Sequence, residues 1–222
     1  MQPDSTSTKI RPMQLSDLDQ AAAIHCDLFP DAPWTFLGKG FIRRMFHWAV
    51  VSYPQLAFVA QSDQAIVGYV FGLFGGYRYF RQQVSRYAYA QALWGFLSHP
   101  GLFSRRDGVI LWRSFWKDLR EGGRKLPRQA EKVITAAFMG VSAPAQKKGL
   151  GNLCMGTFEQ TAWGLGARTL NLYTKASYLA ARRLYERRGW YITREEGENV
   201  YYALQRPDSL EPAGSSPPAA AG

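Results

Sequence analysis

The chain has 222 residues, of which 46% are hydrophobic and 20% charged, and this composition excludes a protein that is disordered over most of its length. Its net charge is +10, and residues 76–132 carry most of it, with 12 Lys and Arg against 4 Asp and Glu. A basic block of this kind predicts an anionic partner, such as a nucleotide-like cofactor, a phospholipid surface or nucleic acid.

Cysteine use and the N-terminal sequence bear on localisation. Cys26 and Cys154 are too few and too far apart in sequence for a disulfide framework, so we expect a reducing compartment. The first ten residues lack the basic and apolar regions of a secretory signal, and the apolar run at 65–76 is too short to span a bilayer as a helix. We expect a cytoplasmic protein, and peripheral membrane contact stays open.

The N-terminal third predicts an α/β pattern. A short strand at 9–13 precedes a helix that Ser16 can cap and that runs to about Phe29. Residues 30–33, Pro-Asp-Ala-Pro, end that helix, and a second amphipathic helix follows over about 35–51. Two apolar runs on either side of residues 62–64 then predict a β-hairpin.

From residue 77 to about 129 the pattern changes. Residues 80–97 and 107–120 predict two helices, separated by Ser-His-Pro-Gly and followed by a Gly-rich basic segment. We interpret residues 76–132 as a helical insertion within one domain that spans residues 1–206.

The C-terminal part returns to alternating strands and helices. Strand patterns end at Val141 and cover 167–174, and helices are predicted over about 149–164 and over 178–189, where Gly189 ends the second. Two further strands complete the sheet. The tail at 207–222 is rich in Pro, Gly, Ser and Ala, which predicts disorder.

The loop "AQKKGLGN", residues 145–152, separates a predicted strand from a predicted helix. A dinucleotide-binding turn would need a third small residue where Cys154 stands, and a Walker loop would need Lys and then Ser or Thr after Gly151. What remains is the general device of bare backbone amides at the positive end of a helix, which suits a pyrophosphate. The glycines could otherwise serve only to turn the chain.

The wider context resembles the GNAT superfamily of N-acyltransferases. Gln146, two residues, Gly149, one residue and Gly151 fit its first motif, and Leu184-Tyr185, three residues, Gly189 and Trp190 fit its second at the expected distance. The resemblance covers 133–206 well, 7–75 by element order alone, and not the insertion. It implies an α/β (α+β) fold with a mixed, mostly antiparallel sheet.

The resemblance also implies a site for acetyl-CoA as cosubstrate. Backbone amides of the loop would hold its pyrophosphate, and the backbone of Val141 would pair with its pantetheine arm. The loop residues that the motif places there are Gln146, Lys147, Lys148, Gly149, Leu150, Gly151 and Asn152. No His, Cys or carboxylate cluster has the spacing of metal ligands, so no metal is expected.

For chemistry, the resemblance implies that Tyr185 is the general acid near the sulfur of the thioester. His25, at the end of the first helix, is a candidate base for the amine, although a structural histidine is the alternative. Two positions depart from the family: Tyr178 replaces an asparagine, and the strand ending at Val141 has no glutamate.

The acceptor is open. We expect a small-molecule primary amine, with a nucleotide-activated amino sugar as one candidate, and the alternative is a non-catalytic acyl-CoA sensor or membrane-docked adaptor. The Arg- and aromatic-rich residues 77–128 predict a helical pair docked on the core, a lid on an anionic membrane, or an arginine-lined pocket for a phosphate-bearing acceptor. Nucleic-acid binding ranks last.

Overall fold

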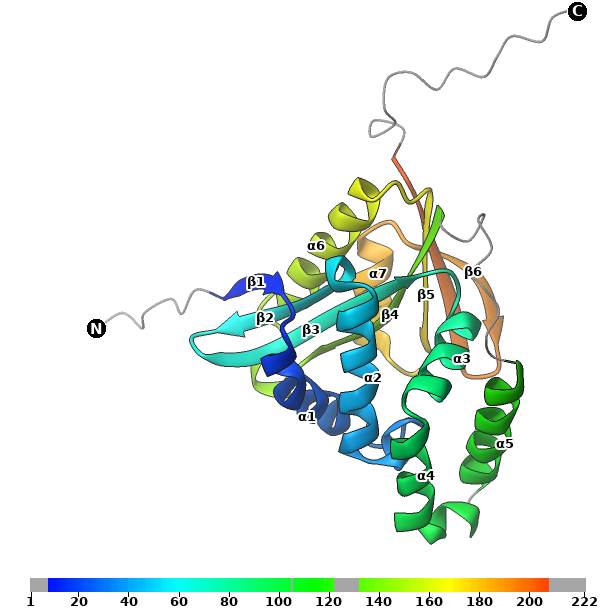
Figure 1. Ribbon diagram of the computed structural model, residues 1–222. Coiled ribbons are helices and arrows are strands. Elements are labelled where there is room, and N and C mark those ends of the chain that lie inside the picture. Colours follow the sequence, from blue (N-terminus) through cyan, green and yellow to red (C-terminus); the bar gives the residue numbers. More distant parts are fainter. Residues whose placement is uncertain (1–7, 105, 122–131, 208–222) are drawn as a thin grey trace, which may run out of the picture.

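The computed structural model describes residues 8–104, 106–121 and 132–207. A seven-stranded sheet in the order β1-β2-β3-β4-β5-β7-β6 forms its centre (Figure 1). All described strand pairs are antiparallel except β4 and β5, which confirms the mixed, mostly antiparallel prediction. The strands are β1 (Lys9–Pro12), β2 (Ala57–Ser62), β3 (Ala65–Phe74), β4 (Val133–Val141), β5 (Thr169–Lys175), β6 (Tyr191–Glu196) and β7 (Asn199–Gln205).

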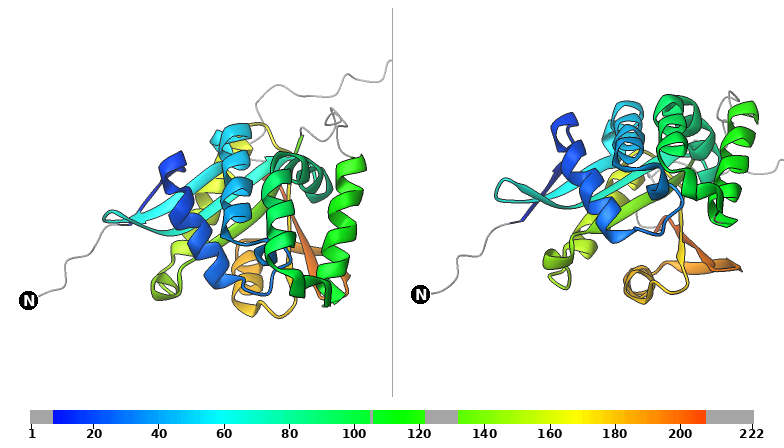
Figure 2. Two further views of the ribbon diagram at one scale, coloured as in Figure 1. Left: turned by 60° about the horizontal axis from the view of Figure 1, so that its bottom comes forward. Right: turned by 90° about the horizontal axis from the view of Figure 1, so that it is seen from below.

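Helices cover both faces of the sheet (Figure 2). One face carries α1 (Leu18–Leu28), α2 (Lys39–Ser52), α3 (Tyr77–Tyr87), α4 (Tyr89–Ser98) and α5 (Arg106–Glu121). The other carries α6 (Leu150–Gly164) and α7 (Leu179–Arg187). Each face buries its own hydrophobic cluster, one centred on Phe46 and Phe71 and the other on Phe158 and Leu170, because strand side chains alternate between the faces.

The parallel strands β4 and β5 stay together only briefly. Their pairing begins at Val133 with Thr169 and ends at Thr135 with Asn171. From Ala136 to Val141, β4 therefore pairs with β3 but has no partner strand on its β5 side. A one-residue β-bulge lies at the start of this stretch: Phe71 and Gly72 are consecutive on β3 but pair with Phe138 and Ala136, so Ala137 is the extra residue and β4 bends there.

The start of α1 differs from the prediction. Ser16 does not cap the helix, because it lies inside a 3-10 turn, Leu15–Asp17, that precedes Leu18. The carboxylate of Asp17 accepts a hydrogen bond from the Gln14 backbone N–H at 2.7 Å and two from the guanidinium of Arg11 at 2.6 and 2.8 Å. A buried ion pair thus fixes this turn in place of a serine hydroxyl.

Helices occupy the described part of residues 76–132, as predicted, but the first is divided. The chain turns at Ala88, so the predicted helix over 80–97 is two helices, α3 and α4. No Gly or Pro marks this break, which follows from packing: α3 lies against α5, whereas α4 lies against the 3-10 turn at Thr35–Leu37. Gly95 permits that approach, because a Cβ there would lie 2.6 Å from the Leu37 carbonyl oxygen.

Residues 208–222, for which the sequence predicts disorder, lie outside the described residues, as do positions 122–131 of the insertion. In the described part of the chain, no helix combines the length and the apolar character needed to cross a membrane.

Candidate active site

The glycine loop leads from β4 into α6, as the sequence predicts. Gly149 has φ +80°, a left-handed conformation that glycine adopts without strain, and Lys147 also has a positive φ of 61°. The first N–H to close a helical bond is that of Leu153, which donates to the Gly149 carbonyl. The amides that precede it are left for a ligand or water, at the positive end of the α6 dipole.

Gly149 and Gly151 lack a side chain for different reasons, as their surroundings show. A Cβ at Gly149 would meet nothing within 4 Å, so the positive φ and not crowding requires glycine there. At Gly151 the φ is helical, and a Cβ would meet only Leu184 Cδ2, at an ordinary contact distance of 3.4 Å. Because nothing in the fold requires a bare Gly151, close approach of a ligand to the backbone explains it best.

Val141 and Gln146 lie together at the end of β4. The N–H of Ser142 donates to Val67 on β3, so by strand alternation the N–H and C=O of Val141 point to the opposite, unpaired edge. There the side-chain amide of Gln146 donates to the Val141 carbonyl at 2.9 Å. The interaction ties the loop to the strand and leaves the Val141 N–H for an extended ligand.

Tyr185 lies on α7 and is 7% exposed, packed against Trp190 and Tyr202 at ring centroid distances of 6.1 and 5.7 Å. Among the described residues its hydroxyl has no hydrogen-bond partner. Burial, and next the neighbouring Tyr202, raise the pKa of Tyr185 well above its usual value. The phenol therefore keeps its proton at neutral and moderately alkaline pH, as a general acid must.

A polar network that the sequence analysis missed ties α6 to α7. Glu159 of α6, 7% exposed, accepts two hydrogen bonds from the Arg188 guanidinium and one from Trp190 Nε1 at 2.7 Å. Arg188 also donates to the Asn152 side chain at 2.6 Å. The network fixes the helix that carries Tyr185 relative to the glycine loop. Only the position of Arg188 beside Gly189-Trp190 could have hinted at it.

His25 is buried, at 1% exposure, on the other face of the sheet. Its Nδ1 lies 2.7 Å from the Tyr69 hydroxyl, and the rings of Phe29, Phe46 and Phe138 surround it. Burial lowers the pKa of His25 to about 4, so the imidazole is neutral at physiological pH and is a weak base. Its role as a catalytic base stays a prediction.

Tyr69 brings this pair next to the open edge of β4. It is the register partner of Gly140, and a Cβ on Gly140 would lie 3.0 Å from the Tyr69 hydroxyl. Burial raises the pKa of Tyr69, and Cys26 and Tyr185 raise it further. Tyr69 and Tyr185 belong to the hydrophobic clusters on opposite faces of the sheet, and Tyr69 lies beside Gly140, the residue that precedes Val141.

The insertion contributes an aromatic side chain to the region where β4 and β5 separate. Tyr77, at the start of α3, packs edge-on against Tyr173 of β5 at 4.8 Å and lies 6.5 Å from Phe138 of β4. Trp34, in the α1–α2 connection, donates its indole N–H to the Tyr77 hydroxyl at 2.8 Å. We call Trp34, Tyr77, Phe138 and Tyr173 the aromatic wall.

One arginine of the insertion lies behind the aromatic wall. Arg81 of α3 makes a two-pronged ion pair with Asp118 of α5, whose side chain is 3% exposed. Because Asp118 neutralises it, Arg81 is not a free cation for a phosphate-bearing acceptor. The arginine-lined pocket that the sequence analysis left open gains no support at this position.

Two kinds of chemistry that the sequence analysis set aside, metal binding and a reactive Cys154, can be checked over the described ranges 8–104, 106–121 and 132–207. No three His, Cys, Asp or Glu side chains there gather as a metal ion would require. Cys154 is fully buried, and burial raises its pKa to about 11, so its thiol is a core side chain.

Comparison with known proteins agrees with this geometry. The family model described as the acetyltransferase (GNAT) family matches residues 21–190. No curated protein matches the chain.

Solved structures share the fold at low sequence identity. PH1933 from Pyrococcus horikoshii OT3 is 16% identical with a TM-score of 0.59, over 90% of this chain and 99% of that one. An N-acetyltransferase from Staphylococcus aureus Mu50 is 14% identical with a TM-score of 0.57, over 90% and 98%. The yncA protein from Salmonella typhimurium, solved with its cofactor acetyl-CoA, is 13% identical with a TM-score of 0.55, over 90% and 94%.

The fold and the loop thus define an acyltransferase. The family match covers well over half of the chain, and the chain belongs to the GNAT acetyltransferase family.

Proposed function

We propose that the protein transfers an acetyl group from acetyl-CoA to the primary amine of a small molecule by direct attack. One observation carries the proposal: the edge of β4 that β5 leaves unpaired ends at Val141 and leads to the bare amides before Leu153, and the protonated Tyr185 follows Leu184, which lies against Gly151. The neighbour from Salmonella typhimurium, solved with acetyl-CoA, supports the choice of cosubstrate.

The residues present fit that cosubstrate. The amides of Lys147 to Asn152 suit a pyrophosphate, since Gly149 faces open space and Gly151 is bare for no reason internal to the fold. The Val141 N–H faces the unpaired edge, where an extended pantetheine amide can pair. When bound, acetyl-CoA supplies the acetyl group as a thioester.

Tyr185 would protonate the leaving group, and the aromatic wall would surround the acceptor. Tyr185 holds a proton that a departing thiolate can take, because burial keeps the phenol protonated. The aromatic wall excludes water and offers ring faces to an ammonium or an apolar group on the acceptor. With its lowered pKa, His25 is better suited to holding Tyr69 in place than to removing a proton from an ammonium group.

The acceptor beyond "small-molecule amine" stays a prediction, and so does the nucleotide-activated amino sugar. A non-catalytic acyl-CoA sensor or membrane-docked adaptor is the second candidate. Tyr178, in place of the family asparagine, favours it, because this side chain packs on Phe29 at 5.9 Å instead of presenting an amide to the cofactor.

Tyr185→Phe separates the two candidates. In an enzyme, loss of the phenolic proton lowers kcat by about 10- to 1,000-fold and leaves the Kd of acetyl-CoA unchanged. Turnover is followed by CoA release in a screen of primary amines, and binding by calorimetry. Tyr191→Phe, a change at an exposed tyrosine of β6, is the matched control. Binding of acetyl-CoA without CoA release for any amine would favour the sensor.

A further inference from the structure

The described helices of the insertion leave one end uncovered by the rest of the protein. Helices α4 and α5, joined by the 3-10 segment Pro100–Ser104, extend beyond the ends of the strands at the bottom of Figure 1. We call the four large apolar residues exposed there the apolar tip. They are Trp94 at 73% exposure, Leu97 at 76%, Phe103 at 45% and Ile110 at 51%.

The apolar tip is not a loosely folded end. Phe103 packs on Phe96 and Trp112, with ring centroids 6.1 and 5.4 Å apart. Gly108 lets α5 lie directly on the preceding turn, because a Cβ there would overlap the carbonyl of Leu102. Trp94 and Leu97, three residues apart, share one face of α4, whereas Phe96 behind them is buried. The exposed side chains are thus held on a rigid support.

A stripe of positive charge runs from the apolar tip along α5. Positions 106, 110, 113, 117 and 120 recur at spacings of four and three and so share one helix face. All five are exposed, and apart from Ile110 they are cations: Arg106, Arg113, Lys117 and Arg120. We call these four residues the basic stripe. Within the described residues none of them makes an ion pair.

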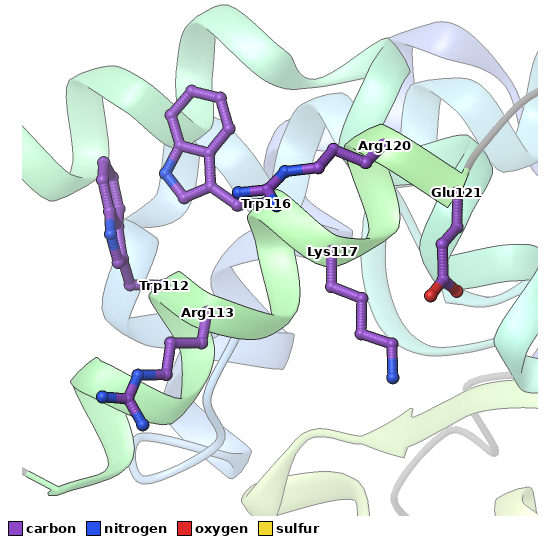
Figure 3. A pocket seen from close by; sticks show the side chains of 6 residues that line it. All are labelled: Trp112, Arg113, Trp116, Lys117, Arg120 and Glu121. Carbon is purple, nitrogen blue, oxygen red and sulfur yellow. The ribbon is translucent and has the colours of Figure 1, made fainter.

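The two α5 carboxylates whose side chains the structure describes pair with arginines of α3 and not with the basic stripe. Asp118 lies on the buried face and pairs with Arg81, and Glu121 pairs with Arg78. Beside the stripe, a pocket of about 490 Å³ is lined by Trp112, Arg113, Trp116, Lys117, Arg120 and Glu121. Figure 3 shows the two indoles on one side of α5, with Arg120 extending along the helix toward Trp116. Indoles beside cations, which here make no ion pair with any described residue, are typical of surfaces that meet lipid head groups.

We propose that the apolar tip and the basic stripe dock this protein on an anionic lipid surface. Apolar side chains at a rigid end can enter the acyl boundary, and neighbouring Arg and Lys gain from the negative surface potential. Nucleic acid would use the cations but would leave Trp94 and Leu97 in water. The inference does not depend on which amine the enzyme acetylates.

The test is co-sedimentation of the full chain, without acetyl-CoA, with two kinds of vesicle. One is pure phosphatidylcholine, and the other contains about one third phosphatidylglycerol. The proposal predicts binding to the anionic vesicles alone, and a loss of binding when salt is raised from about 0.1 M to about 1 M, which shortens the Debye length from about 10 Å to about 3 Å.

Two variants and two matched controls assign the contact. The first variant, a double substitution of the apolar tip, should weaken vesicle binding at least about tenfold; it is Trp94→Ser with Leu97→Ser. The second, a triple substitution of the basic stripe, should weaken binding by about fivefold for each cation that reaches the lipid surface; it is Arg106→Gln with Arg113→Gln and Lys117→Gln. The control for the apolar substitutions is Val51→Ser with Leu165→Ser, at two exposed apolar residues at the ends of α2 and α6. The control for the cation substitutions is a triple change at exposed cations elsewhere, Lys9→Gln with Arg183→Gln and Arg187→Gln. These controls should bind like the wild type.

Several outcomes would overturn the proposal. They are no binding to anionic vesicles, equal binding to phosphatidylcholine, and binding that neither variant weakens. Sedimentation velocity can give another contradicting outcome. If the wild type is a dimer, if the double variant Trp94→Ser with Leu97→Ser is a monomer, and if vesicles are not bound, then the apolar tip is a contact between two copies of the chain. The Kd of acetyl-CoA, measured by calorimetry on the same variants, shows whether the proposed cofactor site is intact whatever the outcome with vesicles.

Discussion

The two sides of the site are built from different materials. On the proposed cofactor side, the Val141 N–H and the amides of residues 147–152 have no partner within the described backbone, and the Gln146 side chain ties the loop to the strand. On the proposed acceptor side, the aromatic wall consists of side-chain rings contributed by the α1–α2 connection, α3, β4 and β5. A backbone site can bind the same cofactor in many sequences, whereas a site made of side chains changes with each sequence. The acceptor side therefore sets what is particular to this protein.

The strongest way to disturb the cofactor side is to break the link between α6 and α7. Arg188→Ala leaves the carboxylate of Glu159 buried with only Trp190 as a partner, which should destabilise the protein by about 3 kcal/mol. Urea unfolding measures the change. Arg187→Ala, one residue away and exposed, should cost less than about 0.5 kcal/mol. Equal effects of the two substitutions would show that the network fixes nothing.

The acceptor side should respond independently. Tyr77→Leu keeps an apolar side chain but removes the ring and the hydroxyl that Trp34 contacts, so the KM for the best amine should rise about tenfold, or about 1.4 kcal/mol. The Kd of acetyl-CoA should not change. Tyr89→Leu, at an exposed tyrosine of α4, is the control. A rise in the acetyl-CoA Kd without a rise in the amine KM would show that Tyr77 belongs to the cofactor side and not to the acceptor side.

A third effect is a pH dependence of stability that comes from His25. Its folded pKa of about 4 lies below the unfolded value of about 6.5, so between these values the unfolded chain binds one more proton and stability falls as pH falls. From pH 7 to pH 5 the loss should be about 2 kcal/mol in the wild type and absent in His25→Phe. Urea midpoints at the two pH values measure it. Parallel curves for both proteins would mean that His25 is protonated in the folded state.

The difference between the two sides also explains what could be predicted from the sequence. Strands, helices and the glycine loop follow local patterns, and Gly149 proves to have the positive φ that a bare-backbone turn needs. The spacing of Gln146 and Gly151 is enough to predict a cofactor loop, because its residues are neighbours in sequence, and their contact with acetyl-CoA stays a prediction.

The features that the sequence did not reveal are non-local. The contacts of Trp34 with Tyr77, of Tyr77 with Tyr173 and of Glu159 with Arg188 join residues 29 or more positions apart, and no periodicity records them. The break at Ala88 arises because α3 and α4 pack against different partners. The Asp17 turn replaces the predicted Ser16 cap because Arg11, six residues earlier, pairs with it.

The central claim is that Gly151 is bare for a ligand and not for the fold. Calorimetric titration with acetyl-CoA of the wild type, Gly151→Glu and Gly164→Glu tests it most directly, since both substitutions lie on α6 and neither position is crowded. We predict saturable binding by the wild type and by Gly164→Glu, and a loss of at least about 100-fold in folded Gly151→Glu, where a carboxylate would displace the pyrophosphate. Wild-type affinity in Gly151→Glu, or no binding by the folded wild type, would contradict the account.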